Sequence, residues 1–191
     1  MRALFILAGL LAFSASSANA AEGGLLFKGE EALIAYKDEF SVEVVDRVTD
    51  GCLPNPGAIK TRMEAALEAG GLKTAQAQAP LGDQVVVSLL GYSVAPGSCL
   101  LYAEAWLNHW LVARVPYAKQ VETGQETYFA ARHPLGQQLR YLNKSATQSQ
   151  AAKAADDFAA RLASDIKASR QYAAENFPAM EAEYRRLQSA R

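Results

Sequence analysis

The sequence has few of the residue types that build catalytic and metal centres. Only two histidines, His109 and His133, and two cysteines, Cys52 and Cys99, occur among 191 residues. The chain has no G-x-S-x-G, H-E-x-x-H, C-x-x-C or G-x-G-x-x-G motif and no phosphate loop. These absences exclude the enzymes that such motifs define, and no residue spacing supports a metal site. We therefore predict neither a cofactor nor a metal.

An excess of charge of one sign is also missing. The chain has 19 Lys and Arg against 20 Asp and Glu, a formal net charge of −1. Because nucleic-acid-binding domains present a basic patch or stripe, nucleic acid is not an expected partner. A membrane-spanning helix needs about 20 consecutive apolar residues. The longest later apolar stretch is interrupted by Glu104, Asn108 and Arg114, so no spanning segment is expected in the mature chain.

The first 20 residues have the three parts of a secretory signal peptide. One basic residue precedes an apolar run and a stretch of small residues, and Ala18 and Ala20 occupy the −3 and −1 positions of an A-x-A cleavage site. Removing residues 1–20 leaves 171 residues, the size of one domain. We predict a single α+β domain over residues 21–191, located in the periplasm or secreted.

The two cysteines are expected to form one disulfide. Export places Cys52 and Cys99 in an oxidising compartment, where an even number of cysteines indicates pairing. Closing a loop of this length is worth about 4 kcal/mol in the chain-entropy model. Sequence alone does not show whether the two Cβ atoms come within bonding distance.

Periodicity in the first half of the mature chain predicts strands around one helix. A valine-rich alternation predicts a strand over residues 41–48, followed by a loop at 50–57 that contains two prolines and two glycines. Apolar residues at helical spacing then predict a helix that ends at Gly70. Residues 73–83 are expected to form a polar connection, and residues 85–94 a buried strand.

Two interpretations compete for residues 99–115. As a helix, this segment would place Leu100, Ala103, Leu107 and Leu111 on one face, and its Ala, Leu and Glu content is favourable for helix. As a strand, it would form a hairpin with residues 85–94 through the Pro96-Gly97 turn. A tight turn between two apolar runs favours the hairpin, so we predict a strand.

The second half predicts one more strand and two helices. We predict a strand over residues 126–132, which we expect to end at His133-Pro134. Apolar residues then repeat every three or four positions through Ala173 and predict a long helix, interrupted at Phe177-Pro178 before a short final helix. The N-cap of the long helix is expected among Ser145, Thr147 and Ser149. The predicted fold is α+β, with a small mixed or antiparallel sheet covered on one face by helices, including the long C-terminal one.

The most prominent candidate site is aromatic. In the strand interpretation Tyr102, Trp106 and Trp110 share one face with Glu104, Asn108 and Arg114. Amphipathic aromatic side chains are typical of binding surfaces, so this face could form a binding groove. The alternative, which we favour at this point, is that the long helix packs on this face and covers the tryptophans.

Two other groups of residues complete the candidates. Asn55 lies in the proline-rich loop, which could serve for recognition but is more simply a strand-to-helix turn held by the disulfide. Arg132 is a candidate binding residue. Together with His133 and Glu104, it could instead belong to a dispersed hydrolase site.

The function expected from these features is binding rather than catalysis. We predict an exported, non-catalytic protein that binds a partner or assists assembly in the cell envelope. The alternatives are a carrier for an apolar small molecule, held between the aromatic face and the long helix, and a small hydrolase. The expected partners are thus an envelope protein or an apolar small molecule.

Overall fold

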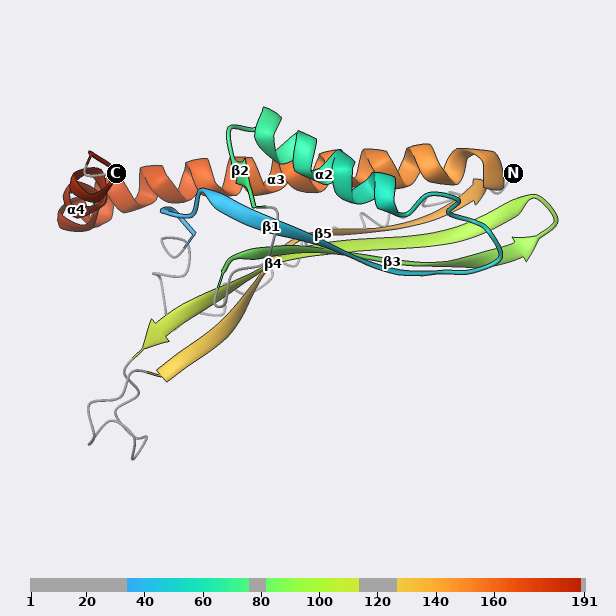
Figure 1. Ribbon diagram of the computed structural model, residues 1–191, viewed down its shortest axis with the longest axis horizontal. Coiled ribbons are helices and arrows are strands. Elements are labelled where there is room, and N and C mark those ends of the chain that lie inside the picture. Colours follow the sequence, from blue (N-terminus) through green and yellow to red (C-terminus); the bar gives the residue numbers. More distant parts are fainter. Residues whose placement is uncertain (1–33, 76–81, 114–126, 190–191) are drawn as a thin grey trace, which may run out of the picture.

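A computed structural model describes residues 34–75, 82–113 and 127–189 of the chain. The signal peptide and its cleavage site lie outside these residues, so both remain predictions. The described strands form one mixed sheet (Figure 1), in the order β2-β1-β3-β4-β5. Their bounds are β1 Glu39–Val48, β2 Lys73–Thr74, β3 Gln84–Ala95, β4 Ser98–Ala113 and β5 Thr127–Asn143.

The segment with two competing interpretations is a strand. β3 and β4 pair antiparallel from Gln84 opposite Asn108 to Ala95 opposite Ser98. Gly97 makes the turn with φ 75°, a left-handed conformation that glycine adopts without steric cost. Alternate residues of β4 are buried, which is the period of two that a half-buried strand requires. The predicted hairpin is therefore confirmed.

Parallel pairing on the other side makes the sheet mixed. β1 pairs with β3 in parallel, and the chain between these strands includes helix α2, Gly57–Ala69. A short strand, β2, also pairs in parallel with β1. The expectation of a polar connection over residues 73–83 was wrong for its first two residues, which form β2. Two residues are too few for a periodic pattern to reveal a strand.

Strand β5 is much longer than expected. It continues past His133 and Pro134 to Asn143, so the predicted end at His133-Pro134 was wrong. The pairing with β4 shifts here, because Trp106 pairs with Pro134 whereas Ala105 pairs with Gly136. Such a bulge at a sheet edge accommodates a proline, which has no N–H to donate to a neighbouring strand.

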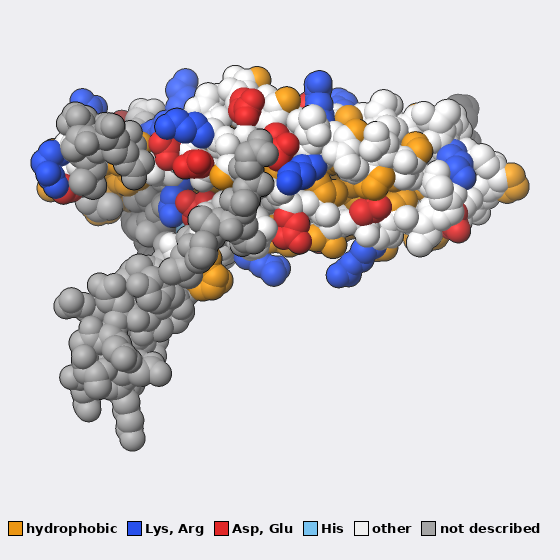
Figure 2. All heavy atoms as spheres, viewed as in Figure 1, with side chains coloured by type: hydrophobic (Ala, Val, Ile, Leu, Met, Phe, Trp, Pro, Cys, Tyr) orange, Lys and Arg blue, Asp and Glu red, His pale blue; other side chains and the backbone are white. Residues whose placement is uncertain are grey.

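The helices pack on one face of the sheet. α2 and the long helix α3, Thr147–Asn176, lie side by side over the same face (Figure 1), as predicted. The core lies between this layer and the sheet. Its largest fully buried side chains include Phe40, Ile59, Met63, Leu67, Leu89, Leu107, Phe158, Leu162 and Ile166. Figure 2 shows acidic and basic side chains interspersed along the helical layer.

The ends of α3 agree only partly with expectation. The short 3-10 helix η2, Lys144–Ala146, leads directly into α3, and Ala146 occupies the N-cap position with no side-chain hydrogen bond. The Thr147 and Ser149 hydroxyls instead donate back to carbonyls of the preceding turn. The predicted side-chain cap was therefore wrong. The break before Pro178 is confirmed, and α4, Pro178–Ser189, follows it.

The predicted disulfide is present. Cys52 and Cys99 are bonded, with a Cα–Cα distance of 6.0 Å, and both are fully buried. The bond joins the loop before α2 to the start of β4. In the described part of the chain, no helix is both long enough and apolar enough to cross a membrane.

Candidate binding face of the sheet

The two sides of β4 lie in different environments. Leu101, Ala103, Ala105 and Leu107 are buried beneath the helices. Tyr102, Glu104, Trp106 and Asn108 alternate with them and lie on the opposite side, which we call the open face because neither α2 nor α3 lies on it (Figure 1). Trp110 continues this row and is 37% exposed. The open face therefore carries the aromatic residues that the sequence singled out.

The expectation that the long helix covers these aromatic residues was wrong. α3 packs on the other face, where Phe158 is 2% exposed within the core. Side-chain volume gives the reason. The small Ala103 and Ala105 allow helices to approach the sheet closely, whereas a row of tyrosine and tryptophan would hold a helix away. Arg114, expected in the same row, lies outside the described residues.

Most of the exposed apolar surface lies on this open face. Seven large hydrophobic side chains are exposed among the described residues, and all except Phe177 lie here. The two most exposed are Leu139 at 66% and Tyr141 at 65%, both on β5. The apolar patch consists of Leu90, Tyr92, Val94, Leu100, Tyr102, Leu139 and Tyr141.

Sequence reasoning found only Tyr102 of this patch. The predicted strand over residues 85–94 was expected to be buried throughout. The predicted strand over residues 126–132 ended before Leu139 and Tyr141. The exposure of Leu90 and Tyr92 could have been predicted. When one face of a hairpin is exposed, both of its strands expose every second residue on that face. No comparable signal was available beyond the proline in β5.

The polar groups of the open face interact with its aromatic rings. The Arg132 guanidinium lies 5.0 Å from the centre of the Trp106 ring, a cation–π geometry. The Tyr102 hydroxyl donates to Glu104 Oε2 at 2.9 Å. This hydrogen bond, followed by burial and the carboxylate charge, raises the pKa of Tyr102 above its ordinary value. The Trp106 indole N–H is buried and has no hydrogen-bond partner among the described residues.

The dispersed hydrolase site is not assembled. Arg132 and Glu104 lie on the open face, whereas His133 lies on the helix-covered face and contacts Asp165 of α3 at 2.9 Å. Asp165 also pairs with Arg161. The sheet therefore separates the histidine from the other two candidates. It also separates the aromatic row from α3, so no cavity for an apolar ligand can lie between them.

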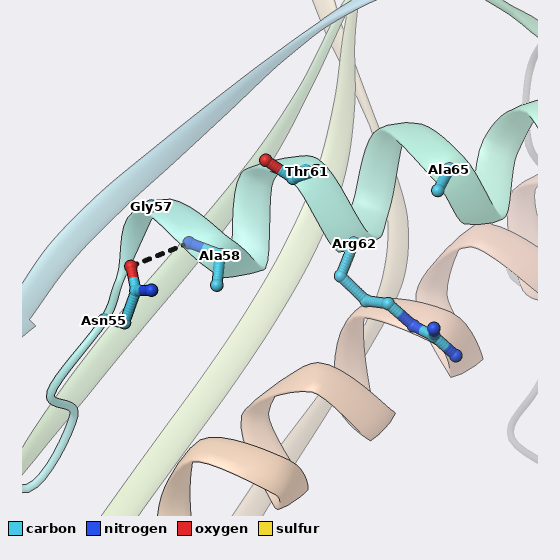
Figure 3. A pocket seen from close by; sticks show the side chains of 6 residues that line it. All are labelled: Asn55, Gly57, Ala58, Thr61, Arg62 and Ala65. Atoms are coloured by element: carbon cyan, nitrogen blue, oxygen red, sulfur yellow. Dashed lines mark hydrogen bonds between the residues drawn. The ribbon is translucent and has the colours of Figure 1, made fainter.

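Asn55 lies away from the open face, at the start of α2. Its Oδ1 accepts from the Ala58 N–H at 3.2 Å (Figure 3), and its backbone exchanges two hydrogen bonds with the Gln148 side chain of α3. These contacts make the proline-rich loop a structural turn. A shallow hollow lies beside it, lined by Asn55, Gly57, Ala58, Thr61, Arg62 and Ala65.

The single charge that lines this hollow is already paired. Arg62 reaches toward α3 (Figure 3) and binds both carboxylate oxygens of Asp156, at 2.6 and 2.8 Å. These hydrogen bonds raise the pKa of Arg62. Over residues 34–75, 82–113 and 127–189, no group of three or more His, Cys, Asp or Glu side chains could hold a metal ion.

These features define an α+β protein with two helices over one sheet face and an aromatic, apolar surface on the other. No protein-family model matches the chain, and no curated protein matches its sequence. Among solved structures, it is similar to a PelC variant from Paraburkholderia phytofirmans that was solved as a dodecamer. The sequence identity is 15% and the TM-score 0.36, over 66% of this chain and 87% of that one. A similarity this low supports no inference about function.

Proposed function

We propose that this protein is exported to the periplasm or beyond and acts by binding a protein partner in the cell envelope through the open face. The observation that carries this proposal is the apolar patch. Soluble monomeric proteins rarely expose large contiguous apolar surfaces, and those that do generally use them as interaction sites. The Cys52–Cys99 disulfide supports the location, because such bonds persist outside the reducing cytosol.

The form of the patch favours a macromolecular partner over a small molecule. Small-molecule sites are concave and enclose most of their ligand. The patch instead extends over three adjacent strands, and its members are exposed or half-buried. A surface that mixes leucine with tyrosine is also typical of protein interfaces, where tyrosine is enriched. The binding function therefore rests on the extent and chemistry of the surface.

Site-specific photo-crosslinking in the envelope of the native host tests this proposal. A photoreactive residue at Leu139 should form protein adducts in cells. The same residue at Ala160, which is exposed on the opposite side of the molecule on α3, serves as the control. Equal labelling from both positions, or none from Leu139, would contradict binding through the open face. N-terminal sequencing of the exported protein should begin at Ala21, and recovery of Met1 would contradict export by cleavage.

A further inference from the structure

The apolar patch has a regular arrangement across the sheet. The strand register aligns six of its seven residues into two neighbouring rows that run across β3, β4 and β5, and the seventh, Val94, lies at the register shift in β3. One row reads leucine, tyrosine, leucine and the next reads tyrosine, leucine, tyrosine. The first row is Leu90, Tyr102 and Leu139, and the second is Tyr92, Leu100 and Tyr141. Each tyrosine therefore has leucine as its neighbour both along and across the strands.

From this pattern we infer that the partner of the open face is a second copy of this chain, packed face to face. The inference rests on the proposed function and narrows it to one partner. A two-fold axis that lies between the two sheets, across the strands and midway between the rows, places each row over the other row of the second copy. Leu90 then faces Tyr92, Tyr102 faces Leu100, and Leu139 faces Tyr141. Every large ring meets a smaller aliphatic side chain, which is the condition for two sheets to interdigitate.

The charges of the open face are compatible with this arrangement. The patch contains no Lys, Arg, Asp or Glu, so pairing it with itself brings no like charges together at the centre. Glu104 belongs to the row beyond Tyr102 and comes opposite Ser98 of the second copy. Arg47 of β1 continues the first row beside Leu90, and it comes opposite the β1 position of the second row rather than opposite Arg47 of the second copy. A symmetric contact that buried like charges would be penalised strongly, and none arises at the patch itself.

The available area is close to what a stable dimer requires. Counting about 200 Å² for a fully exposed large side chain, the five exposed members of the patch contribute on the order of 500 Å² per chain. The half-buried Leu100 and Tyr102 and the surrounding atoms add to this. The total approaches the roughly 800 Å² per partner of a standard interface. Sheet-on-sheet packing would also bury the side of the sheet that the helices leave uncovered.

Sedimentation of residues 21–191 with the disulfide intact tests self-association. We expect twice the mass of one chain at tens of micromolar, and dissociation on dilution. Leu139→Glu and Tyr141→Glu should each weaken self-association at least about tenfold, because each would bury an unpaired charge against the apolar surface of the second copy. Ala160→Glu should leave it unchanged. A monomer at all concentrations, or equal weakening by all three variants, would overturn the inference. Circular dichroism verifies that each variant is folded.

Cysteine crosslinking tests the register. In the proposed dimer, position 139 of one copy faces position 141 of the other. Mixing Leu139→Cys protein with Tyr141→Cys protein should therefore give disulfide-linked pairs faster than either variant alone. Similar rates for all combinations, including a mixture with Ala160→Cys, would overturn the inference. If the chain is monomeric yet photo-crosslinks from Leu139 to a different protein, the second copy is ruled out while the proposed binding function stands.

Discussion

At position 102, a tyrosine hydroxyl is held by a neighbouring carboxylate on an otherwise apolar surface. The hydrogen bond to Glu104 raises the pKa of Tyr102 because ionisation would place two negative charges side by side. We expect Glu104→Gln to lower this pKa toward the ordinary value of about 10. Ultraviolet titration, with Tyr102→Phe used to assign the signal, measures the change.

The direction of the effect on stability follows from linkage. Because the pKa of Tyr102 is higher in the folded than in the unfolded chain, the stabilisation is complete below the unfolded pKa and is lost as pH rises through the folded pKa. Glu104→Gln should therefore make unfolding less sensitive to alkaline pH. An unchanged titration of Tyr102 in this variant would show that the carboxylate does not hold the hydroxyl.

The two tryptophans of the open face should behave differently in solution. Trp110 is 37% exposed, whereas the Trp106 ring is half-buried, lies beside Arg132 and has its N–H shielded from solvent. We expect acrylamide to quench Trp110 fluorescence more strongly than that of Trp106. Trp106→Phe and Trp110→Phe each leave one emitter, so the two quenching constants can be measured separately. Similar constants would contradict the described difference in exposure.

At the scale of the element, Phe158 is the largest of the side chains that α3 buries in the core. Phe158 is 2% exposed and lies over Gly136 of the β5 bulge. We expect Phe158→Ala to lower the free energy of unfolding by about 3–5 kcal/mol, the range for a large-to-small core change. Urea denaturation measures this loss. Phe177→Ala, which truncates an exposed ring outside the sheet, should cost much less, and equal losses would contradict the assignment of Phe158 to the core.

The elements that sequence periodicity predicted are those with long one-sided patterns. α3 shows its apolar stripe over many turns, so its periodicity alone predicted it. For β4 the periodicity also allowed a helix, and the tight turn that joins it to another apolar run favoured the strand. The end of β5 was not predictable. Pro134 normally signals the end of a strand, but here Gly136, with φ 144°, forms part of a bulge that allows pairing to continue. Whether a proline ends a strand or enters a bulge depends on the neighbouring strand, which a local pattern does not contain.

At the scale of the whole molecule, the candidate site depended on which side of the sheet the helices cover. The sequence correctly placed Tyr102, Trp106 and Trp110 on one face of a strand. It did not determine that α2 and α3 would pack on the other face. That depends on the side-chain volumes that β1, β3 and β4 together present on each face. Arg132 lies on the open face because β5 pairs with β4, which places it opposite Asn108. Asn55 did not join it, since its hydrogen bonds hold the start of α2.

The disulfide connects these distant parts and should contribute strongly to global stability. It closes a loop between residues 47 positions apart, which corresponds to about 4 kcal/mol of chain entropy. We expect the double variant Cys52→Ala, Cys99→Ala to lose about this much free energy of unfolding, measured by guanidinium denaturation against the oxidised parent. The parent protein with its disulfide reduced should have the same free energy of unfolding as the double variant, because neither has the cross-link.

Because both cysteines are buried, thiol labelling gives a second test of the disulfide. Cys99 directly precedes Leu100, the central residue of one row of the apolar patch, and its bond to Cys52 secures this end of β4 from the helix-covered side. Both sulfurs are shielded from solvent, so a reductant should not reach the bond until the chain unfolds. Thiol labelling of the denatured, unreduced protein should then find no free thiol. Two reactive thiols per chain would rule out the bond, and a loss far below 1 kcal/mol in the double variant would show that other contacts already hold the loop.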